Sequence, residues 1–320
     1  MAGSQANVLS VSADDLVGRS PAMEQLRSDV LRIARHNINV LLEGESGTGK
    51  ELVARLLHAS GPRSSKPFVG VNCAAIHESL LESELFGHEA GAFTGAAKAT
   101  LGFLRCADEG TVLLDEIGDM SEALQSKLLR VLEQREVIPV GSTKRIPVNV
   151  RVVAATHRDL LQAVHDGSFR RDLYYRINVV RLYIPPLRER REDIPPLAER
   201  FSRSVARTLR LQVREISPAA MKLLQEHDWP GNVRELSNVI QRAYVLGSGG
   251  TIGPDDLPER LGEGGLTWEA SDFPTLDEQV CSHVRNALSR AGGVRTRAAD
   301  MLGIDRSTLW RMIKRYDLRI

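Results

Sequence analysis

The chain has 320 residues, of which 42% are hydrophobic and 26% charged, and its formal net charge is +1. This length and composition are ordinary for a soluble protein of two or three domains, and the odd, widely spaced cysteines (Cys73, Cys106 and Cys281) suggest neither a disulfide framework nor a metal site. No apolar run approaches the roughly 18 to 20 residues of a membrane span, and the N-terminus lacks the pattern of a signal peptide, so we expect a cytoplasmic protein with no membrane partner.

Strand-like apolar runs alternate with amphipathic helical segments over the first part of the chain. The runs are INVLLEG, FVGVNC, TVLLDE and VRVVAAT, and EALQSKLLRVLEQ is one of the helical segments. This alternation predicts an α/β fold in which helices cover a parallel sheet.

A glycine-rich loop, GESGTGKE, follows the first of these runs and precedes a helical LVARLLH. A strand, a glycine loop, a lysine and a helix in this order predict a nest of backbone N–H groups around phosphate oxygens. The expected cofactor-binding residues are Gly44, Glu45, Ser46, Gly47, Thr48, Gly49, Lys50 and Glu51. Because Glu51 stands where many such loops carry a Mg²⁺-binding Ser or Thr, Thr48, water or a carboxylate from another motif must serve the metal.

The run TVLLDE supplies that carboxylate at the end of a strand. Open α/β sheets bind ligands at the carboxyl ends of their strands. We therefore expect Asp115 to orient Mg²⁺ and its waters, and Glu116 to position and deprotonate the attacking water. Together with the catalytic Lys50, this pair predicts hydrolysis of the nucleotide and not binding alone.

The segment GAFTGA encloses one aromatic and one hydroxyl residue between flexible glycines. An exposed aromatic on a mobile loop favours a role in binding a partner protein, and a surface hairpin without a partner is the alternative. The expected contact residues are Gly91, Ala92, Phe93, Thr94, Gly95 and Ala96.

Helices dominate after IPPLRERREDIPPLAERF, and the stretch from Gly247 to Pro274 is rich in Gly, Pro and acidic residues, which is typical of loops and linkers. We divide the chain into an N-terminal tail (1–15), an α/β subdomain (16–184), a small helical lid (185–250), a linker (251–274) and a C-terminal domain (275–320).

The C-terminal domain is basic, with nine Lys or Arg against five Asp or Glu from Asp277 onward. Two short helical patterns meet at Gly303 in RTRAADMLGIDRSTLWRMIKRY, which predicts an all-α helix-turn-helix with Leu309 facing inward; a generic helical hairpin is the alternative. The polar or basic residues expected to contact bases and phosphates of double-stranded DNA are Arg306, Ser307, Thr308, Arg311, Lys314 and Arg315.

Six motifs together resemble the AAA+ domain of bacterial enhancer-binding proteins, the activators of sigma-54 RNA polymerase: GESGTGKE, ELFGHEAGAFTGA, LLDEIGDM, FRRDLYYR, PPLRERREDI and WPGNVREL. The resemblance covers about Leu16 to Leu246, and the C-terminal domain resembles the Fis-type helix-turn-helix of the same activators. It implies an AAA+ P-loop NTPase fold, ATP and Mg²⁺ as cofactors, a homo-oligomeric, hexameric ring, and sigma-54 RNA polymerase and upstream enhancer DNA as partners. GAFTGA would be the loop tip that grips sigma-54.

The resemblance also implies roles for single residues. Asn72 is similar to the switch residue that holds the catalytic glutamate until ATP is bound, and Thr156 to the first sensor of the γ-phosphate. Arg170 and Arg176 match the paired arginines that reach into a neighbouring subunit's site, and Arg234 matches the second sensor.

Several positions depart from the family pattern, among them Thr100, Leu104, Arg105 and Glu109 in the segment after GAFTGA. Arg105 stands where the family carries a glutamate in the segment after GAFTGA. His157 replaces the Asn that often follows the first sensor, and the sequence assigns it no role.

We therefore expect a DNA-bound ATPase that remodels the closed sigma-54 promoter complex. One alternative is a DNA-binding regulator whose P-loop domain only senses nucleotide and assembles. Another is an AAA+ machine that acts on DNA structure, which would leave GAFTGA without a purpose. The presence of GAFTGA, Glu116 and the arginine pair favours the first.

Overall fold

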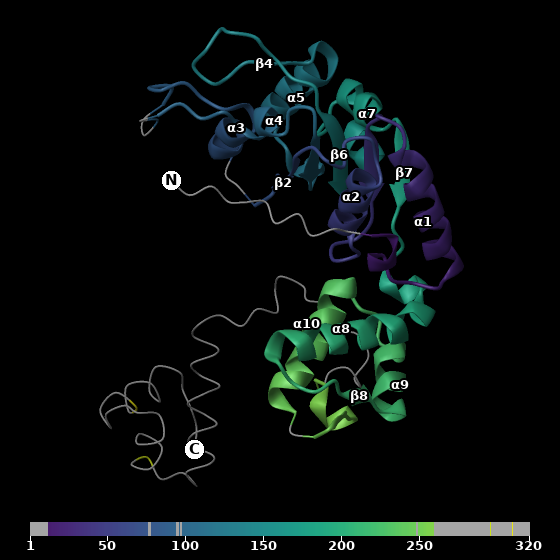
Figure 1. The fold of residues 1–320 in the computed structure, drawn as a ribbon. Coiled ribbons are helices and arrows are strands. Elements are labelled where there is room, and N and C mark those ends of the chain that lie inside the picture. Colours follow the sequence, from purple (N-terminus) through teal and green to yellow (C-terminus); the bar gives the residue numbers. More distant parts are fainter. Residues whose placement is uncertain are drawn as a thin grey trace. The chain divides into compact units, whose positions relative to one another are not determined.

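The computed structural model describes residues 12–75, 78–93, 96, 98–247 and 249–258, together with Arg295 and Leu309. The chain divides into two compact units, residues 1–265 and 266–320. The first unit contains a parallel sheet with its helices and a smaller, mainly helical lid (Figure 1).

The sheet has five parallel strands in the order β2-β3-β6-β1-β7. The strands are β1 (Val40–Glu43), β2 (Phe68–Asn72), β3 (Thr111–Asp115), β6 (Arg151–Thr156) and β7 (Val180–Tyr183). Four of them confirm the sequence prediction, and β7 was not predicted because VRLY is a short edge strand with Arg181 and Tyr183 exposed. The order places the carboxyl ends of β1, β6 and β3 side by side.

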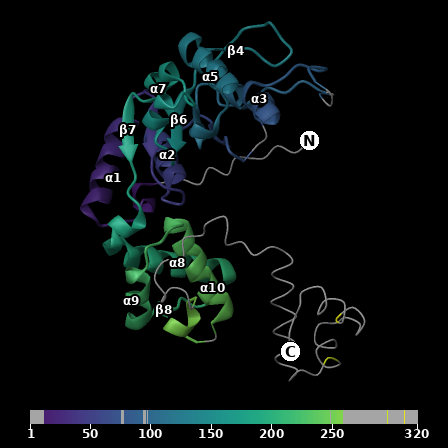
Figure 2. The ribbon, with the colours of Figure 1, turned by 180° about the vertical axis from the view of Figure 1, so that it is seen from behind.

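Helices cover both faces of this sheet (Figures 1 and 2). They are α1 (Pro21–Ala34), α2 (Lys50–Ala59), α3 (Glu78–Phe86), α4 (Phe103–Cys106), α5 (Glu122–Gln134), α6 (Leu160–His165) and α7 (Arg171–Ile177). Alternate residues of a strand point to opposite faces, so Leu41 packs into one core and Leu42 into another. The predicted helix EALQSKLLRVLEQ is confirmed as α5, which Ser121 caps by accepting a hydrogen bond from the Leu124 amide.

A short antiparallel hairpin, β4 (Glu136–Val137) and β5 (Ile146–Pro147), follows α5. The sequence analysis did not foresee it, because two-residue strands carry almost no periodicity. Cys73, which directly follows β2, is buried, and burial raises the pKa of its thiol to about 12, so the group stays protonated.

The lid consists of α8 (Ile194–Leu209), α9 (Pro218–Glu226) and α10 (Asn232–Leu246). Its core surrounds Trp229, which is fully buried and donates from Nε1 to the Leu224 carbonyl at 2.8 Å. The lid also contains a short strand pair that the sequence analysis did not foresee, β8 (Glu215–Ile216) with β9 (Thr251–Ile252). Ile252 and Leu257 also pack into the lid core. Within the described part of the chain, no helix is both long and apolar enough to cross a membrane.

Candidate nucleotide-binding site and GAFTGA loop

The P-loop connects β1 to α2, and two of its carbonyl groups accept hydrogen bonds from the side chain of Lys50. Gly47 and Gly49 have φ values of +79° and +106°, which only glycine adopts readily. The buried Lys50 Nζ donates to the Gly44 carbonyl at 2.8 Å and to the Glu45 carbonyl at 3.3 Å. The ammonium group therefore lies inside the loop, at the place where phosphate oxygens bind in such nests.

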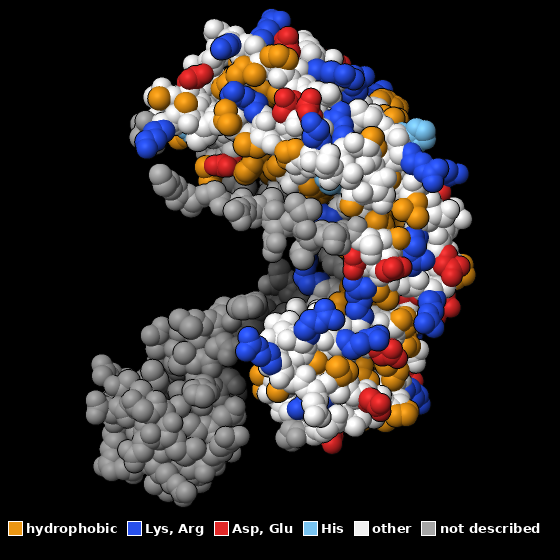
Figure 3. Space-filling model, in the orientation of Figure 1, with side chains coloured by type: hydrophobic (Ala, Val, Ile, Leu, Met, Phe, Trp, Pro, Cys, Tyr) orange, Lys and Arg blue, Asp and Glu red, His pale blue; other side chains and the backbone are white. Residues whose placement is uncertain are grey.

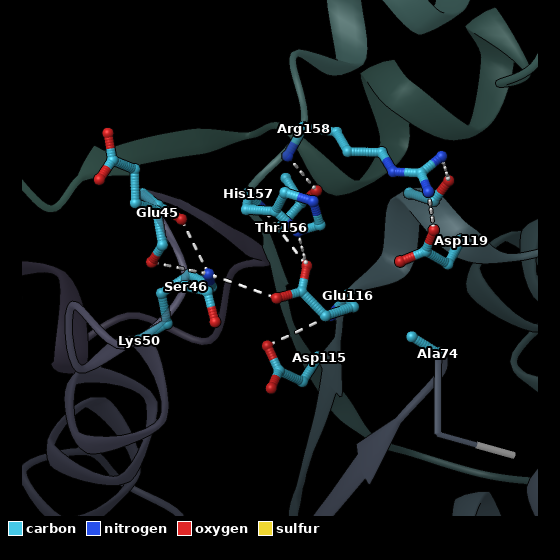
Figure 4. A network of polar contacts seen from close by, with 12 residues as sticks. Glu45, Ser46, Lys50, Ala74, Asp115, Glu116, Asp119, Thr156, His157 and Arg158 are labelled. Atoms are coloured by element: carbon cyan, nitrogen blue, oxygen red, sulfur yellow. Dashed lines mark hydrogen bonds and ion pairs between the residues drawn. The ribbon is translucent and has the colours of Figure 1, made fainter. Parts of the chain in front are cut away.

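Glu116 lies directly after β3 and points toward this lysine (Figure 4). Its Oε1 is 3.5 Å from Lys50 Nζ, and its Oε2 contacts His157 Nδ1 at 2.6 Å and the His157 amide at 3.2 Å. Burial alone would raise the pKa of the Glu116 carboxyl, but the hydrogen bond from His157 and the charge of Lys50 outweigh it, so the pKa lies below its ordinary value. The group is a carboxylate at neutral pH, as a proton acceptor must be.

Asp115 and Asn72 lie opposite each other in the register of β3 and β2. Burial and the adjacent Glu116 charge raise the pKa of the Asp115 carboxyl, and Lys50 opposes them. The Asn72 side chain closes its own turn, because Oδ1 accepts from the amides of Ala74 at 2.9 Å and Ala75 at 3.0 Å. In this structure, therefore, His157 makes the contact with Glu116 that was expected of Asn72.

The end of β6 is tied to the turn that follows Glu116. Thr156 is fully buried at this end, and its Oγ1 accepts from the Arg158 amide at 3.0 Å. The Arg158 guanidinium pairs with Asp119 in the turn η2 (Ile117–Asp119). The strand that carries the expected first sensor thus supports the loop that carries the expected base.

The lid contacts the P-loop through its first α10 turn. The Arg234 amide donates to the Gly47 carbonyl at 3.3 Å, and its guanidinium donates to Ser46 Oγ at 3.2 Å. Glu45 forms a two-point ion pair with Arg188, with N–O distances of 2.5 and 2.8 Å. The Arg188 hydrogen bond lowers the pKa of the Glu45 carboxyl. Asn232 Nδ2 adds bonds to Glu45 Oε2 at 3.1 Å and to the Ser46 carbonyl at 3.0 Å.

Two cavities adjoin at the P-loop and share Gly49 and Leu52. The first, the polar cavity, has a volume of about 360 Å³ and is lined largely by charged side chains, among them Lys50, Asp115, Glu116 and Arg234. The second, of about 380 Å³, is lined mainly by apolar side chains, namely Leu16, Val17, Leu52, Leu197, Phe201 and Val233. A polar chamber beside an apolar one matches a nucleotide with its phosphates in the first and its base in the second.

Arg170, which precedes α7, and Arg176, within α7, do not line these cavities. Arg170 pairs with Asp172 at 2.7 Å, and Arg176 donates to the Leu132 carbonyl at 3.0 Å. The Arg176 carbonyl in turn accepts from Asn39, which precedes β1. Arg176 therefore lies near the amino ends of the strands, whereas the P-loop lies at their carboxyl ends.

The GAFTGA segment lies in the connection between α3 and α4, which projects from the α/β subdomain (Figure 1). Gly91, Ala92, Phe93 and Ala96 are described, whereas Thr94 and Gly95 lie outside the described residues. The Gly91 amide donates to the Ala96 carbonyl at 2.8 Å. The Phe93 ring is 45% exposed and packs edge-on against the His88 ring, with centroids 5.0 Å apart.

The base of this loop is tightly built. Backbone hydrogen bonds join His88 to Thr100. Gly102 has a φ of +75°, and a Cβ there would lie 2.3 Å from the Gly87 amide nitrogen, so only glycine fits. A Cβ on Gly141, in the turn between β4 and β5, would lie 2.7 Å from the Ala92 Cβ. The loop thus has a closely packed base and carries an exposed aromatic side chain, Phe93.

Three known protein families match successive parts of the chain. The family described as the sigma-54 interaction domain matches residues 16–183, the AAA+ ATPase lid domain matches residues 188–272, and the Fis family of bacterial regulatory proteins matches residues 281–316. The chain belongs to the sigma-54-dependent transcriptional activators.

Relatives of this activator share its arrangement over most of their length. Transcriptional regulatory protein ZraR of Escherichia coli (strain K12) is 50% identical over 301 residues, covering 94% of this chain and 68% of ZraR. Regulatory protein AtoC of the same organism is 46% identical over 312 residues, covering 95% of this chain and 68% of AtoC. The crystal structure of NtrX from Brucella abortus in complex with ADP has a TM-score of 0.73 at 37% identity and covers 96% of this chain and 71% of that one. NtrX has also been solved with ATP, at the same TM-score and identity.

The activator thus has the AAA+ P-loop NTPase fold with a helical lid, followed by a Fis-type helix-turn-helix domain. Leu309 is helical and buried, as expected for the second helix of that domain. The six expected DNA-contacting residues lie outside the described residues. Sequence reasoning missed the apolar cavity and the contact between His157 and Glu116, because no local motif marks either.

Proposed function

We propose that this activator hydrolyses Mg²⁺·ATP and uses the free energy to remodel the closed complex of sigma-54 RNA polymerase in the cytoplasm. The observation that carries the proposal is the Glu116 carboxylate, which faces the polar cavity 3.5 Å from Lys50 Nζ. A module that only sensed nucleotide would need the lysine but no carboxylate aimed beside it.

The residues around the cavities fit ATP. Lys50 already donates to two loop carbonyls, and phosphate oxygens would accept these bonds in their place. Arg234 brings a second cation from the lid, and the apolar cavity beside Phe201 and Val17 accommodates a base.

Mg²⁺ also fits, with Asp115 as its protein ligand. Mg²⁺ is commonly held by one or two carboxylates together with phosphate oxygens and water, and a cation beside Asp115 would offset the burial that raises the pKa of this carboxyl. Bound Mg²⁺ would neutralise charge on the β- and γ-phosphate oxygens. Glu51 pairs with Arg55 at 2.7 Å, and the Thr48 hydroxyl donates to the Glu45 carbonyl, so Asp115 remains the first candidate.

Within this site Glu116 would accept the proton of the attacking water through Oε1. Arg170 and Arg176 would act on the site of a neighbouring copy in a homo-oligomeric, hexameric ring. The placement of Arg176 near the amino ends of the strands supports this, because its own P-loop lies at the opposite edge of the sheet.

GAFTGA would transmit the nucleotide state to sigma-54. A short contact route supports this role: the turn after Glu116 leads to Ser121, whose hydroxyl donates to Glu78 at the start of α3. The end of α3 enters the loop that carries Phe93. The helix-turn-helix domain would hold the ring at upstream DNA.

Purified protein tests the proposal through two comparisons. Lys50→Ala should abolish ATP binding, whereas Glu116→Gln should bind ATP and lose hydrolysis. Phe93→Ala and Thr94→Ala should hydrolyse ATP at near the wild-type rate but fail to activate a sigma-54 promoter in a reconstituted system. Near wild-type hydrolysis by Glu116→Gln would contradict the assigned base, and full activation by Phe93→Ala would contradict the assigned loop.

A further inference from the structure

We infer that His157 is a positioning residue that holds one oxygen of Glu116 so that the other faces the nucleotide. This inference rests on the proposed ATP hydrolysis and adds to it a residue for which the sequence predicted no role.

Two hydrogen-bonding groups of His157, its backbone amide and Nδ1, converge on one atom. The backbone amide lies 3.2 Å and Nδ1 lies 2.6 Å from Glu116 Oε2 (Figure 4). An ionised carboxylate only accepts hydrogen bonds, so the proton of this imidazole lies on Nδ1. Oε1 remains directed toward Lys50 Nζ and the polar cavity.

Glu116 needs such a partner because nucleotide binding would remove its ion pair with Lys50. Lys50 is expected to leave Oε1 when phosphates bind, and the backbone of Glu116 is held at φ 54° and ψ 48°, a conformation disfavoured for residues other than glycine. With Lys50 on the phosphates, His157 would keep the carboxylate from rotating away from the water.

The chain around His157 is firmly anchored. Thr156 before it is fully buried at the end of β6, and Arg158 after it pairs with Asp119 of η2. The imidazole itself is 44% exposed, so its replacement removes little packing. Loss of activity in a His157 variant would therefore not be a consequence of unfolding.

Side-chain length provides the matched controls. Nδ2 of asparagine is separated from the backbone by the same number of bonds as Nδ1 of histidine, whereas the amide nitrogen of glutamine is one bond further away. His157→Asn should preserve the bond to Oε2, and His157→Gln and His157→Ala should remove it.

The first measurement is steady-state ATP hydrolysis by the full chain. A hydrogen bond to a charged group corresponds to about a 10- to 100-fold change in kcat, so His157→Ala and His157→Gln should lose that much in kcat. Their KM for ATP should stay near the wild-type value, and His157→Asn should retain most of the wild-type kcat. Unchanged or faster hydrolysis by His157→Ala, or equal losses in the Asn and Gln variants, would overturn the inference.

The second measurement does not depend on hydrolysis. In ¹⁵N-histidine-labelled wild type, NMR should detect a proton on Nδ1 of His157, assigned by its loss in His157→Asn, and this signal should shift or disappear in Glu116→Ala. A wild-type His157 whose proton lies on Nε2 would overturn the inference even if the protein hydrolyses ATP. Absence of hydrolysis with the Nδ1 signal intact would instead refute the proposed function and leave the geometry standing.

Discussion

Replacing Gly47 with alanine should separate the lid from the P-loop and weaken both folding and nucleotide binding. Gly47 has a φ of +79°, and a Cβ there would lie 2.3 Å from the Gly231 carbonyl oxygen of the lid. Because real Cβ contacts do not fall below 3.0 Å, the lid turn must retreat by at least 0.7 Å, the difference between these distances. This retreat would stretch the 3.3 Å bond from the Arg234 amide to the Gly47 carbonyl beyond hydrogen-bonding range.

The expected cost has two parts. A residue with a Cβ in the left-handed region costs about 1–2 kcal/mol, and a lost backbone hydrogen bond costs about 1 kcal/mol more. We expect a total of about 2–3 kcal/mol in the free energy of unfolding, measured by urea titration. Because Arg234 moves with the lid and would lose its contact with Ser46 of the P-loop, the Kd for a non-hydrolysable ATP analogue, measured by calorimetry, should rise by about tenfold for each 1.4 kcal/mol of lost contact.

Gly167 supplies the matched control. Its φ is +77°, and a Cβ there would meet no described heavy atom within 4 Å. Gly167→Ala should therefore lower the free energy of unfolding only by the cost of the left-handed backbone conformation, and it should bind the analogue with the wild-type Kd. If the two variants lose equal stability and bind the analogue equally well, the reasoning about the contact between lid and P-loop is refuted.

Three further predictions concern the base cavity, the ion pair at the P-loop and the ring. Phe201→Ala should weaken ATP binding by about 1.5–3 kcal/mol, the value of burying such a ring, and leave binding of inorganic triphosphate unchanged; equal losses for both ligands would refute the base cavity. The Arg188 hydrogen bond lowers the pKa of Glu45 in the folded state below its unfolded value of about 4.5. The free energy of unfolding of the wild type should therefore exceed that of Glu45→Gln by its full amount above pH 4.5, and this difference should disappear as the pH falls through the folded-state pKa. Urea unfolding at several pH values measures it, and a difference independent of pH would contradict the reasoning. Mixing Arg176→Ala with Lys50→Ala chains should restore part of the ATPase activity. A mixture whose activity equals the sum of the two separate variants would argue against Arg176 acting on the site of a neighbouring subunit.

Sequence motifs correctly predicted those parts of the site that are formed by contiguous residues. The P-loop could be read from GESGTGKE because its nest, lysine and helix are contiguous, and TVLLDE placed Asp115 and Glu116 correctly at the end of a strand. The apolar cavity could not be read, because Val17, Leu52 and Phe201 come from three separate segments that only the fold unites.

The residue that contacts Glu116 could not be predicted from the motifs either. Asn72 lies in register with Asp115, one residue from the base, yet its carboxamide is used by its own turn at Ala74. His157 reaches Glu116 because β6 pairs with β3 in the sheet, and strand order is not visible in either motif. A motif identifies which groups can react, but the pairing of strands decides which of them meet.

The contacts of the P-loop indicate how ATP binding could affect both the lid and the GAFTGA loop. Lys50 is held by loop carbonyls and by Glu116, while Glu45 is held by Arg188. Phosphates that draw Lys50 away would remove one of the two partners that hold Glu116 in its disfavoured backbone conformation. Any relaxation of Glu116 would shift η2, and with it the bond from Ser121 to the start of α3. Because a ligand moves an equilibrium only by its different affinity for the two states, the ion pair between Lys50 and Glu116 is the contact through which ATP and the loop would be coupled.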